Sequence, residues 1–600
     1  MTGPSDREPV LQLIEAVLDG GSWRTWDEPV PVTTRDPGYR ADLERARERT
    51  GLDESVITGE GRIRGRRVAV VACEFRFLAG SIGVAAGERL VRAVERATAE
   101  RLPLLAAPAS GGTRMQEGTV AFVQMVKVTA AIAGHKAAGL PYLVYLRHPT
   151  TGGVLASWGS LGHLTAAEPG ALIGFLGPRV HRALYGEEFP PGVQTAENLL
   201  AHGLVDAVLS ARELPAVVAA ALDVLCDDTV GAAGTVPPSL SGPEAAGPAA
   251  GADGGPAAPA APSPAGVPDG GAATVSGGTT PPAAPPGREP RRDRAVADGA
   301  PAPAVTEGPA GAGPGAPATA VSATADSIRR SRRPGRPGVR ALLKAAGRQV
   351  TPLSGTGAGE HDPGLLLALA RIGGTPCVVL GHDRHDGAAP PLGPGGLREA
   401  RRGMRIAAEL GLPLLTVVDT AGAALSREAE EGGLAAEIAR SLADLVTLPA
   451  PTLCLLLGQG AGGGALALLP ADRVLAAEHA WLSPLPPEGA SAILHRTTER
   501  ADEVAAQQGV RSADLLAHGI VDRVVAEPGP SEPGPGSGPG SGSGPDAVTD
   551  AADDPGRFLT HLGEVLGREL ALLRAERPEA RLAARRLRHR TLGVRPLPPH

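Results

Sequence analysis

The chain has 600 residues, with 58 Lys and Arg against 65 Asp and Glu, a formal net charge of -7. This balance offers no overall attraction to nucleic acid or to an anionic membrane, so neither is an expected partner. The four cysteines lie far apart and form no C-x-x-C pair, so we expect no metal site and no disulfide framework. No apolar run reaches about 18 residues, which favours a soluble, cytoplasmic protein.

The first block, residues 1–230, alternates short apolar strands with amphipathic helices. Its pattern predicts a helix over 87–100, then the apolar segment 102–105, and a strand over 142–146 that leads into 151–156 (TGGVLA). This rhythm is typical of an α/β domain.

Residues 231–335 have a different composition. Ala, Gly and Pro make up 65 of the 100 residues in 231–330, with no Phe, Tyr, Trp, Met or Cys among them. Such a segment cannot bury enough apolar surface to offset its chain entropy, so we expect a disordered linker.

The second block, residues 336–526, has the α/β rhythm again. It predicts a helix over 396–410, a strand over 452–457 that leads into 462–467 (GGGALA), and a surface helix over 426–445. A Gly, Pro and Ser-rich linker is expected over 527–550. Residues 551–600 form a helical basic tail, whose arginines suggest a solvated or docking face because no aromatic residues lie between them.

The two blocks resemble divergent copies of one pattern. The segment LPLL occurs at 102–105 and at 412–415, the glycine turns fall near 153 and 464, and HGLVD at 202–206 matches HGIVD at 518–522. Three matches in the same order indicate an internal duplication of an α/β domain.

The glycine turns are the candidate functional sites. A strand that ends in Gly-Gly leaves backbone N–H groups without partners, and these can bind a developing oxyanion. The alternative is that these glycines only allow tight turns and close packing. The run 458–463 satisfies G-x-G-x-x-G, but no acidic ribose partner follows at the expected distance, so a dinucleotide site is rejected. No G-x-S-x-G or H-E-x-x-H motif occurs.

Longer motifs resemble those of a known family. The first block resembles the carboxyltransferase β subunit of bacterial acetyl-CoA carboxylase, and the second resembles the α subunit, so that the chain is similar to a β–α fusion. The first-block motifs are 36–39 (DPGY) through 49–52 (RTGL), 57–61 (ITGEG), 110–118 (SGGTRMQEG), 149–154 (PTTGGV) and 167–179 (AEPGALIGFLGPR). The second-block motifs are 412–423 (LPLLTVVDTAGA), 430–432 (EEG), 458–465 (GQGAGGGA) and 483–494 (SPLPPEGASAIL).

The resemblance implies two crotonase-like domains and transfer of a carboxyl group from carboxybiotin to acetyl-CoA. Carboxybiotin would release CO2, the biotin ureido anion would remove the α proton of the thioester, and the enolate would attack CO2 to give malonyl-CoA. Substrate and biotin would supply the reactive groups, which fits a sequence without a catalytic side-chain motif.

The resemblance also assigns residues. Gly152 and Gly153 would hold the acyl-CoA oxygen, and Gly463 and Gly464 the biotin ureido oxygen. Further substrate-binding candidates are Gly111, Gly112, Arg114 and Arg179. For both arginines a structural salt bridge is an equal alternative.

The chain departs from the family pattern in two respects. It lacks the four-cysteine zinc ribbon, and residues 421–424 read AGAA where the family has PGAY, which leaves the acceptor open to another short acyl-CoA such as propionyl-CoA. It also lacks a biotin attachment sequence and an ATP-binding region. The implied partners are therefore a biotin carboxyl carrier protein and a biotin carboxylase. A homo-oligomer is expected, because in the family the sites form between halves of different units.

Two other functions remain open. A crotonase-type hydratase or isomerase would require an acidic residue above the thioester carbons. A noncatalytic scaffold subunit of the carboxylase is suggested by Ala421 and Ala424 in the altered loop.

Overall fold

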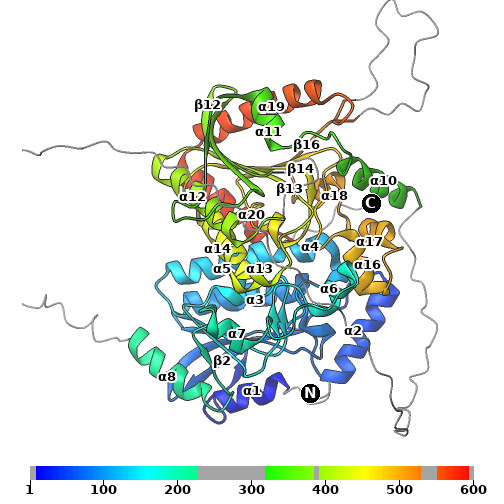
Figure 1. Ribbon diagram of the computed structural model, residues 1–600. Helices are drawn as coiled ribbons and strands as arrows, with labels where there is room; N and C mark the ends of the chain where they lie inside the picture. The colour runs from blue at the N-terminus through cyan, green and yellow to red at the C-terminus, as the bar shows by residue number, and fades with distance from the viewer. Residues whose placement is uncertain (1–8, 227–317, 384–390, 529–549, 594–600) are drawn as a thin grey trace, which may run out of the picture. The chain divides into compact units, whose positions relative to one another are not determined.

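The computed structural model describes residues 9–226, 318–383, 391–528 and 550–593. It contains two seven-stranded sheets, one in each predicted block, and Figure 1 traces the first half in blue to cyan and the second from green onward. The predicted pair of α/β domains is confirmed. No helix in the described ranges has the length and apolarity needed to cross a membrane.

The first sheet has the order β1-β2-β3-β4-β5-β7-β9, and a two-stranded pair, β6-β8, lies outside it. Its strands are β1 (Arg24–Thr25), β2 (Val56–Ile63), β3 (Arg66–Cys73), β4 (Leu104–Ala107), β5 (Tyr142–Leu146), β6 (Thr150–Thr151), β7 (Leu164–Ala167), β8 (Ile173–Gly174) and β9 (Ala207–Val208). The helices of this half are α1 (Val10–Val17), α2 (Pro37–Thr50), α3 (Val84–Ala99), α4 (Gly118–Phe122), α5 (Gln124–Ala137), α6 (Pro178–Tyr185), α7 (Ala196–Ala201) and α8 (Leu214–Leu225).

The second sheet repeats this plan with the order β10 to β16. Its strands are β10 (Gly347–Leu353), β11 (Leu365–Ile372), β12 (Thr375–His382), β13 (Leu414–Thr420), β14 (Thr452–Gly460), β15 (Arg473–Ala477) and β16 (Arg523–Val525). The helices are α10 (Ala318–Ser331), α11 (Val339–Ala346), α12 (Pro394–Leu410), α13 (Arg427–Glu431), α14 (Leu434–Thr447), α15 (Gly462–Leu466), α16 (Pro487–His495), α17 (Ala501–Gln508), α18 (Ser512–Ala517), α19 (Pro555–Ala575) and α20 (Pro578–Arg590).

In both halves an antiparallel hairpin leads into parallel strands. The hairpin β2–β3 turns at Arg64 and Gly65, and β11–β12 turns at Gly373 and Gly374, all four with positive φ. Two positive φ angles give a turn whose twist matches that of the flanking strands. The parallel strands that follow are buried, as in β13, because helices cover both faces of each sheet.

The helices that cover the sheets also join the two halves. α3 packs on α5, α12 packs on α14, and α5 and α14 pack on each other, so one apolar core runs through both halves. The surface helix expected over 426–445 differs in the structure. It is divided at Gly432 and Gly433 into α13 and α14, and the apolar face of α14 is fully buried against α5.

The boundaries of the predicted linkers also differ. The linker was expected to extend to residue 335, but α10 begins at Ala318, because Ala-rich sequence has high helix propensity and Ile328 reaches a buried cluster with Trp481. At the second linker, Glu527 is buried and pairs with Arg336, and Asp550 is buried beside Arg333. Residues 227–317 and 529–549, which hold the rest of both predicted linkers, lie outside the described residues.

The basic tail packs against both halves. α19 packs on β11, β12 and β14, and α20 packs on α5. The Arg585 guanidinium, 1% exposed, donates to Asp472 at 2.7 Å and to the carbonyl oxygens of Leu448 and Ala450. The arginines of α20 therefore form a docking face, which was the favoured interpretation of the sequence.

Replacing Arg585 with Met should destabilise the protein by about 3–5 kcal/mol, because Asp472 would keep its buried charge with one guanidinium fewer. Chemical denaturation of the whole chain measures this loss. The control is Arg586→Met on the same helix, whose side chain is exposed and which should change the free energy of unfolding by less than about 0.5 kcal/mol. Equal stability of the two variants would contradict the buried docking contact.

Candidate active site

The two glycine turns have the same backbone geometry. Gly152 follows β6 with φ 65°, and Gly462 follows β14 with φ 64°. The Gly152 N–H donates to the carbonyl oxygen of Phe175 at 3.0 Å, and the Gly462 N–H donates to that of Ser483 at 2.9 Å. Left-handed φ angles at both positions favour glycine over any residue with a side chain.

The surrounding backbone fixes the correspondence between the halves. Thr151 N–H donates to Ser110, and Ala461 N–H donates to Thr420. The bridge between Ile82 and Thr113 recurs between Leu392 and Ala423. These pairs share an offset of 310 residues, so Gly153 corresponds to Gly463. The sequence match had paired Gly153 with Gly464, one residue too far.

These hydrogen bonds decide which N–H groups remain available for a ligand. The amide of Gly152, which we expected to bind substrate, is already bonded to Phe175. Within the described ranges, no acceptor is assigned to the amide of Gly153 or to that of Gly463. Backbone amides in a folded chain are normally paired, so these two are available to receive a ligand oxygen.

A helix starts at the glycine turn in the second half only. There the short helix α15 starts at Gly462. In the first half, residues 152–157 form a series of turns with one helical hydrogen bond, from the Ala156 N–H to the Gly152 oxygen at 3.0 Å. The amides of this turn are therefore presented by a loop.

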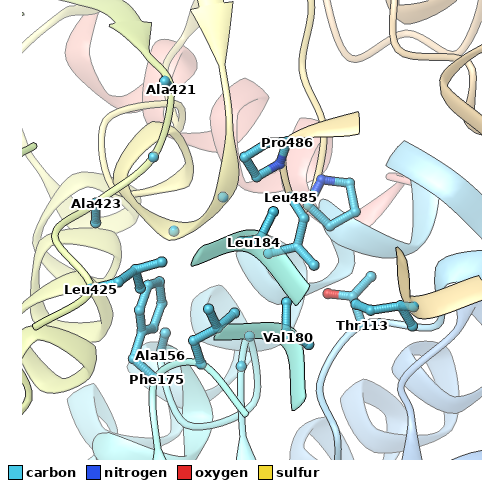
Figure 2. Close-up of a pocket in the computed structure, with 18 of the residues that line it drawn as sticks. Thr113, Ala156, Phe175, Val180, Leu184, Ala421, Ala423, Leu425, Leu485 and Pro486 are labelled. Carbon is cyan, nitrogen blue, oxygen red and sulfur yellow. The ribbon is translucent and has the colours of Figure 1, made fainter. Parts of the chain in front are cut away.

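Both turns line one cavity of about 1870 Å³. Gly152, Gly153 and Phe175 contribute from the first half of the chain, and Gly462 and Gly463 from the second. Figure 2 shows that the side chains of Val180, Leu184, Leu425 and Leu485 surround this space, which makes its wall largely apolar. Two halves of the same chain thus enclose the cavity, and the expectation of sites between halves of different chains stays a prediction.

The cavity wall also carries polar groups that sequence analysis did not select. His382, at the end of β12, is buried, and its Nδ1 accepts the Asp419 N–H at 3.4 Å. Burial lowers the pKa of His382 to about 4, so the imidazole is neutral at pH 7. The Oδ1 of Asp419 accepts the Gln459 N–H at 2.9 Å, which links this wall to the second glycine turn.

The remaining predicted glycines lie close to these turns. Gly111 lines the cavity. A Cβ on Gly112, whose φ is 104°, would lie 3.2 Å from the Gly153 nitrogen, so the backbones touch at this point. Gly464 is buried and is not among the residues that line the cavity; a Cβ there would meet Ala423 at 3.4 Å.

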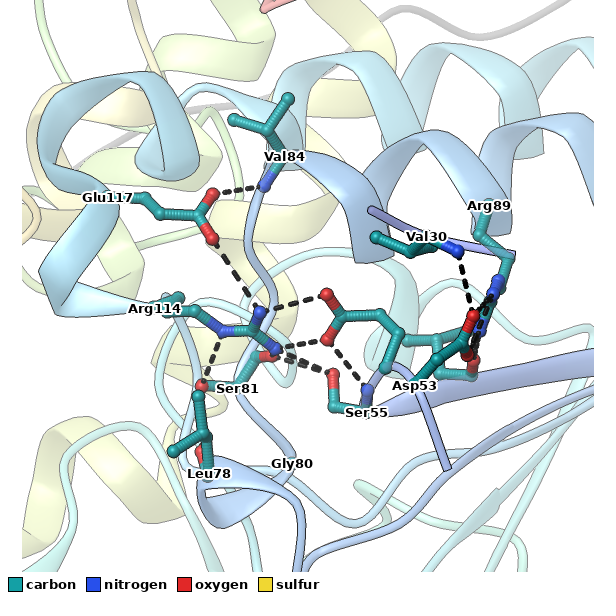
Figure 3. Close-up of polar contacts among 12 residues, drawn as sticks. Val30, Asp53, Ser55, Leu78, Gly80, Ser81, Val84, Arg89, Arg114 and Glu117 are labelled. Carbon is teal, nitrogen blue, oxygen red and sulfur yellow. Dashed lines mark hydrogen bonds and ion pairs between the residues drawn. The ribbon is translucent and has the colours of Figure 1, made fainter. Parts of the chain in front are cut away.

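Arg114 lies in a buried polar network and not on the cavity wall (Figure 3). Its side chain is 1% exposed and forms an ion pair with Glu54, with further bonds to Ser55 and Ser81. The guanidinium lowers the pKa of Glu54 against the opposing effect of burial. Of our two interpretations of Arg114, the structural salt bridge is the one found. Arg179 lies in α6, and its side chain is outside what the structure describes.

Comparison with known proteins gives the same division of the chain. Residues 5–207 match the family described as carboxyl transferase domain, and residues 321–532 match the family described as acetyl co-enzyme A carboxylase carboxyltransferase-like. A protein of Mycobacterium tuberculosis, described as a probable biotin-dependent acyl-coenzyme A carboxylase beta3 subunit, is 52% identical over 585 residues, covering 97% of this chain and 98% of its own. The chain belongs to the carboxyltransferase family of biotin-dependent acyl-CoA carboxylases.

A second sequence relative supports the family assignment, whereas a similar solved structure does not. The acetyl-coenzyme A carboxylase carboxyl transferase subunits beta/alpha of Salinispora arenicola are 38% identical, covering 88% of this chain and 84% of that protein. Among solved structures, the transcarboxylase 12S hexamer with methylmalonyl-coenzyme A covers 95% of this chain and 91% of its own, at 17% identity and a TM-score of 0.33. The family assignment of this carboxyltransferase rests on the sequence relatives alone.

The buried role of Arg114 predicts a loss of stability on substitution. Arg114→Met would leave Glu54 charged, buried and without its ion pair, which should cost about 3–5 kcal/mol in the free energy of unfolding. Denaturant titration tests this, with Arg45→Met as control because Arg45 pairs with Asp42 on the surface of α2. If Arg114→Met unfolded at the wild-type denaturant concentration, the structural assignment would be wrong.

Proposed function

We propose that this carboxyltransferase moves a carboxyl group from carboxybiotin to acetyl-CoA and so forms malonyl-CoA for fatty acid or polyketide synthesis. The observation that carries the proposal is the pair of corresponding amides, Gly153 and Gly463, that line one cavity and lack acceptors in the described part of the chain. Each half is, in this proposal, a crotonase-like domain that supplies one oxyanion site.

The Gly153 amide would bind the thioester oxygen as the α carbon loses its proton and the charge moves onto that oxygen. The Gly463 amide would bind the ureido oxygen of biotin as the carboxyl group leaves the ring nitrogen. The proton from the α carbon goes to that nitrogen, and the carboxyl group goes to the α carbon, so the exchange balances. A fixed amide in a site shielded from water stabilises such charges strongly.

The cavity fits this pair of substrates. It has room for an acyl arm and a biotin ring together, and its wall is largely apolar. The chain would receive biotin on a separate biotin carboxyl carrier protein, loaded by a biotin carboxylase. We propose a homo-oligomer as well, although both halves of one chain already enclose the cavity.

A second acyl-CoA is an alternative to acetyl-CoA as the acceptor of the carboxyl group. The fused relatives at 38% identity are described by acetyl-CoA, but the relative at 52% is described only by acyl-CoA. Residues 421–424 are small and leave space in the cavity wall near Leu425, which favours propionyl-CoA or another short acyl-CoA as the second candidate.

An acyl-CoA panel separates these candidates. Purified protein is given biotinylated carrier, biotin carboxylase, ATP and bicarbonate with acetyl-, propionyl- or butyryl-CoA, and carboxylated products are followed by mass spectrometry. We expect the highest kcat/KM with acetyl-CoA. A higher value for propionyl-CoA would reassign the acceptor, and complex formation without any product would favour the scaffold function. Hydration of crotonyl-CoA would favour the hydratase.

Gly153→Val should lower kcat by about 10²–10³, because the added side chain meets neighbouring atoms and displaces the amide from its position. The built Cβ lies 3.2 Å from Thr113 Oγ1 and 3.4 Å from Met125 Cγ, so the turn or these neighbours must shift. The matched control is Gly134→Val in α5, where a Cβ meets nothing within 4 Å. Wild-type turnover by Gly153→Val would remove the first oxyanion site from the mechanism.

A further inference from the structure

Glu430, in α13 of the second half, is a buried carboxylate with an unusual set of partners. It accepts the Phe175 N–H at 2.8 Å and the Gln194 Nε2 at 2.6 Å, and both donors belong to the first half. No ion pair of Glu430 occurs within the described ranges. Burial raises its pKa, since no cation offsets the loss of water.

Keeping a carboxylate in this place is costly. An ion taken out of water without a counter-charge loses several kcal/mol even when neutral donors bind it. An apolar side chain would avoid that cost but would leave the Phe175 N–H and the Gln194 amide without this acceptor. What Glu430 supplies is therefore a pair of hydrogen bonds that join the two halves.

The backbone of Phe175 connects Glu430 to the first glycine turn. Its N–H is held by the Glu430 carboxylate, and its carbonyl oxygen accepts the Gly152 N–H at 3.0 Å. The next amide along the turn is that of Gly153. A shift of the Phe175 peptide would therefore shift the amide that faces the cavity.

The ring of Phe175 reaches the second glycine turn. A Cβ built on Gly463 would lie 2.9 Å from two ring carbons of Phe175, so the ring rests directly on the glycine backbone. Figure 2 shows the ring pointing into the cavity between Ala156 and Leu425. One residue thus touches both turns, through its backbone in one half and its ring in the other.

We infer that Glu430 and Phe175 are positioning residues that set the two glycine turns at a fixed separation across the cavity. The inference about the reaction rests on the proposed carboxyl transfer, in which two oxygens on different substrates must be held at once. The link itself is a property of the folded chain and can be measured without substrate.

Hydrogen exchange followed by mass spectrometry tests the link from Glu430 through Phe175 to the first glycine turn. Glu430→Gln keeps one acceptor, and Glu430→Leu removes both. We expect deuterium uptake in peptides covering 150–156 and 173–178 to rise in the order wild type, Glu430→Gln, Glu430→Leu, since both segments lose a fixed partner. The control is Glu431→Gln, which also faces the first half, through Asn198 at 3.3 Å, but does not reach Phe175. Equal uptake at 150–156 in wild type and Glu430→Leu would overturn the link.

Steady-state kinetics test whether the position of the two turns affects the reaction. Glu430→Gln should lower kcat by at least tenfold and change the KM for acyl-CoA by less than threefold, because binding surfaces remain while the turns lose their alignment. Glu431→Gln should stay within threefold of wild type in both. A loss confined to KM, or an equal loss in the two variants, would overturn the positioning role.

A second variant covers the case in which Glu430 variants do not fold. Phe175→Leu keeps the backbone bonds to Glu430 and Gly152 and removes the ring from Gly463. It should lower kcat at least tenfold and leave exchange at 150–156 as in wild type; unchanged kcat would overturn the inference. If wild type itself carboxylated no acyl-CoA, the proposed function would fail, while the exchange result would still decide the link.

Discussion

The site depends on a backbone hydrogen bond that occurs twice. In each half, a glycine with left-handed φ follows a strand and donates its N–H to a carbonyl oxygen on a neighbouring loop, Phe175 in one half and Ser483 in the other. This bond turns the chain so that the next amide lines the cavity. The close approach of other backbones, such as that of Gly112 to Gly153, leaves little space for side chains at the first turn.

The rest of the fold holds the two turns in place. Parallel strands buried on both faces precede each turn, β5 and then β6 before Gly152, and β14 before Gly462. The helices α5 and α14 pack across the junction of the halves, and the ion pairs of α20 fix the last segment of the chain onto the second sheet. A chemistry that uses backbone amides needs such rigidity, because the amides have no side-chain freedom with which to correct their position.

The polar residues around the site differ in their partners. Arg114 and Glu54 form a buried pair away from the cavity, whereas Asp419 accepts the Gln459 N–H in the cavity wall of the second half. Glu430 differs from both because it has only neutral donors and because those donors come from the other half. Its cost in burial falls at a place where both turns share a neighbour, Phe175.

The sequence by itself determined the α/β class, the duplication, the family motifs and the two glycine turns, because these depend on local patterns: buried strands, helical spacing and glycine at fixed positions. It did not determine that α10 replaces the last part of a predicted linker, since Ala-rich sequence suits both a helix and a linker. Only the tertiary structure decided that the Gly152 amide is occupied, that Gly153 corresponds to Gly463, and that Arg114 is buried. Phe175 and Glu430 were visible as members of motifs, but their roles depend on contacts between residues 255 positions apart, which spacing in a single sequence does not encode.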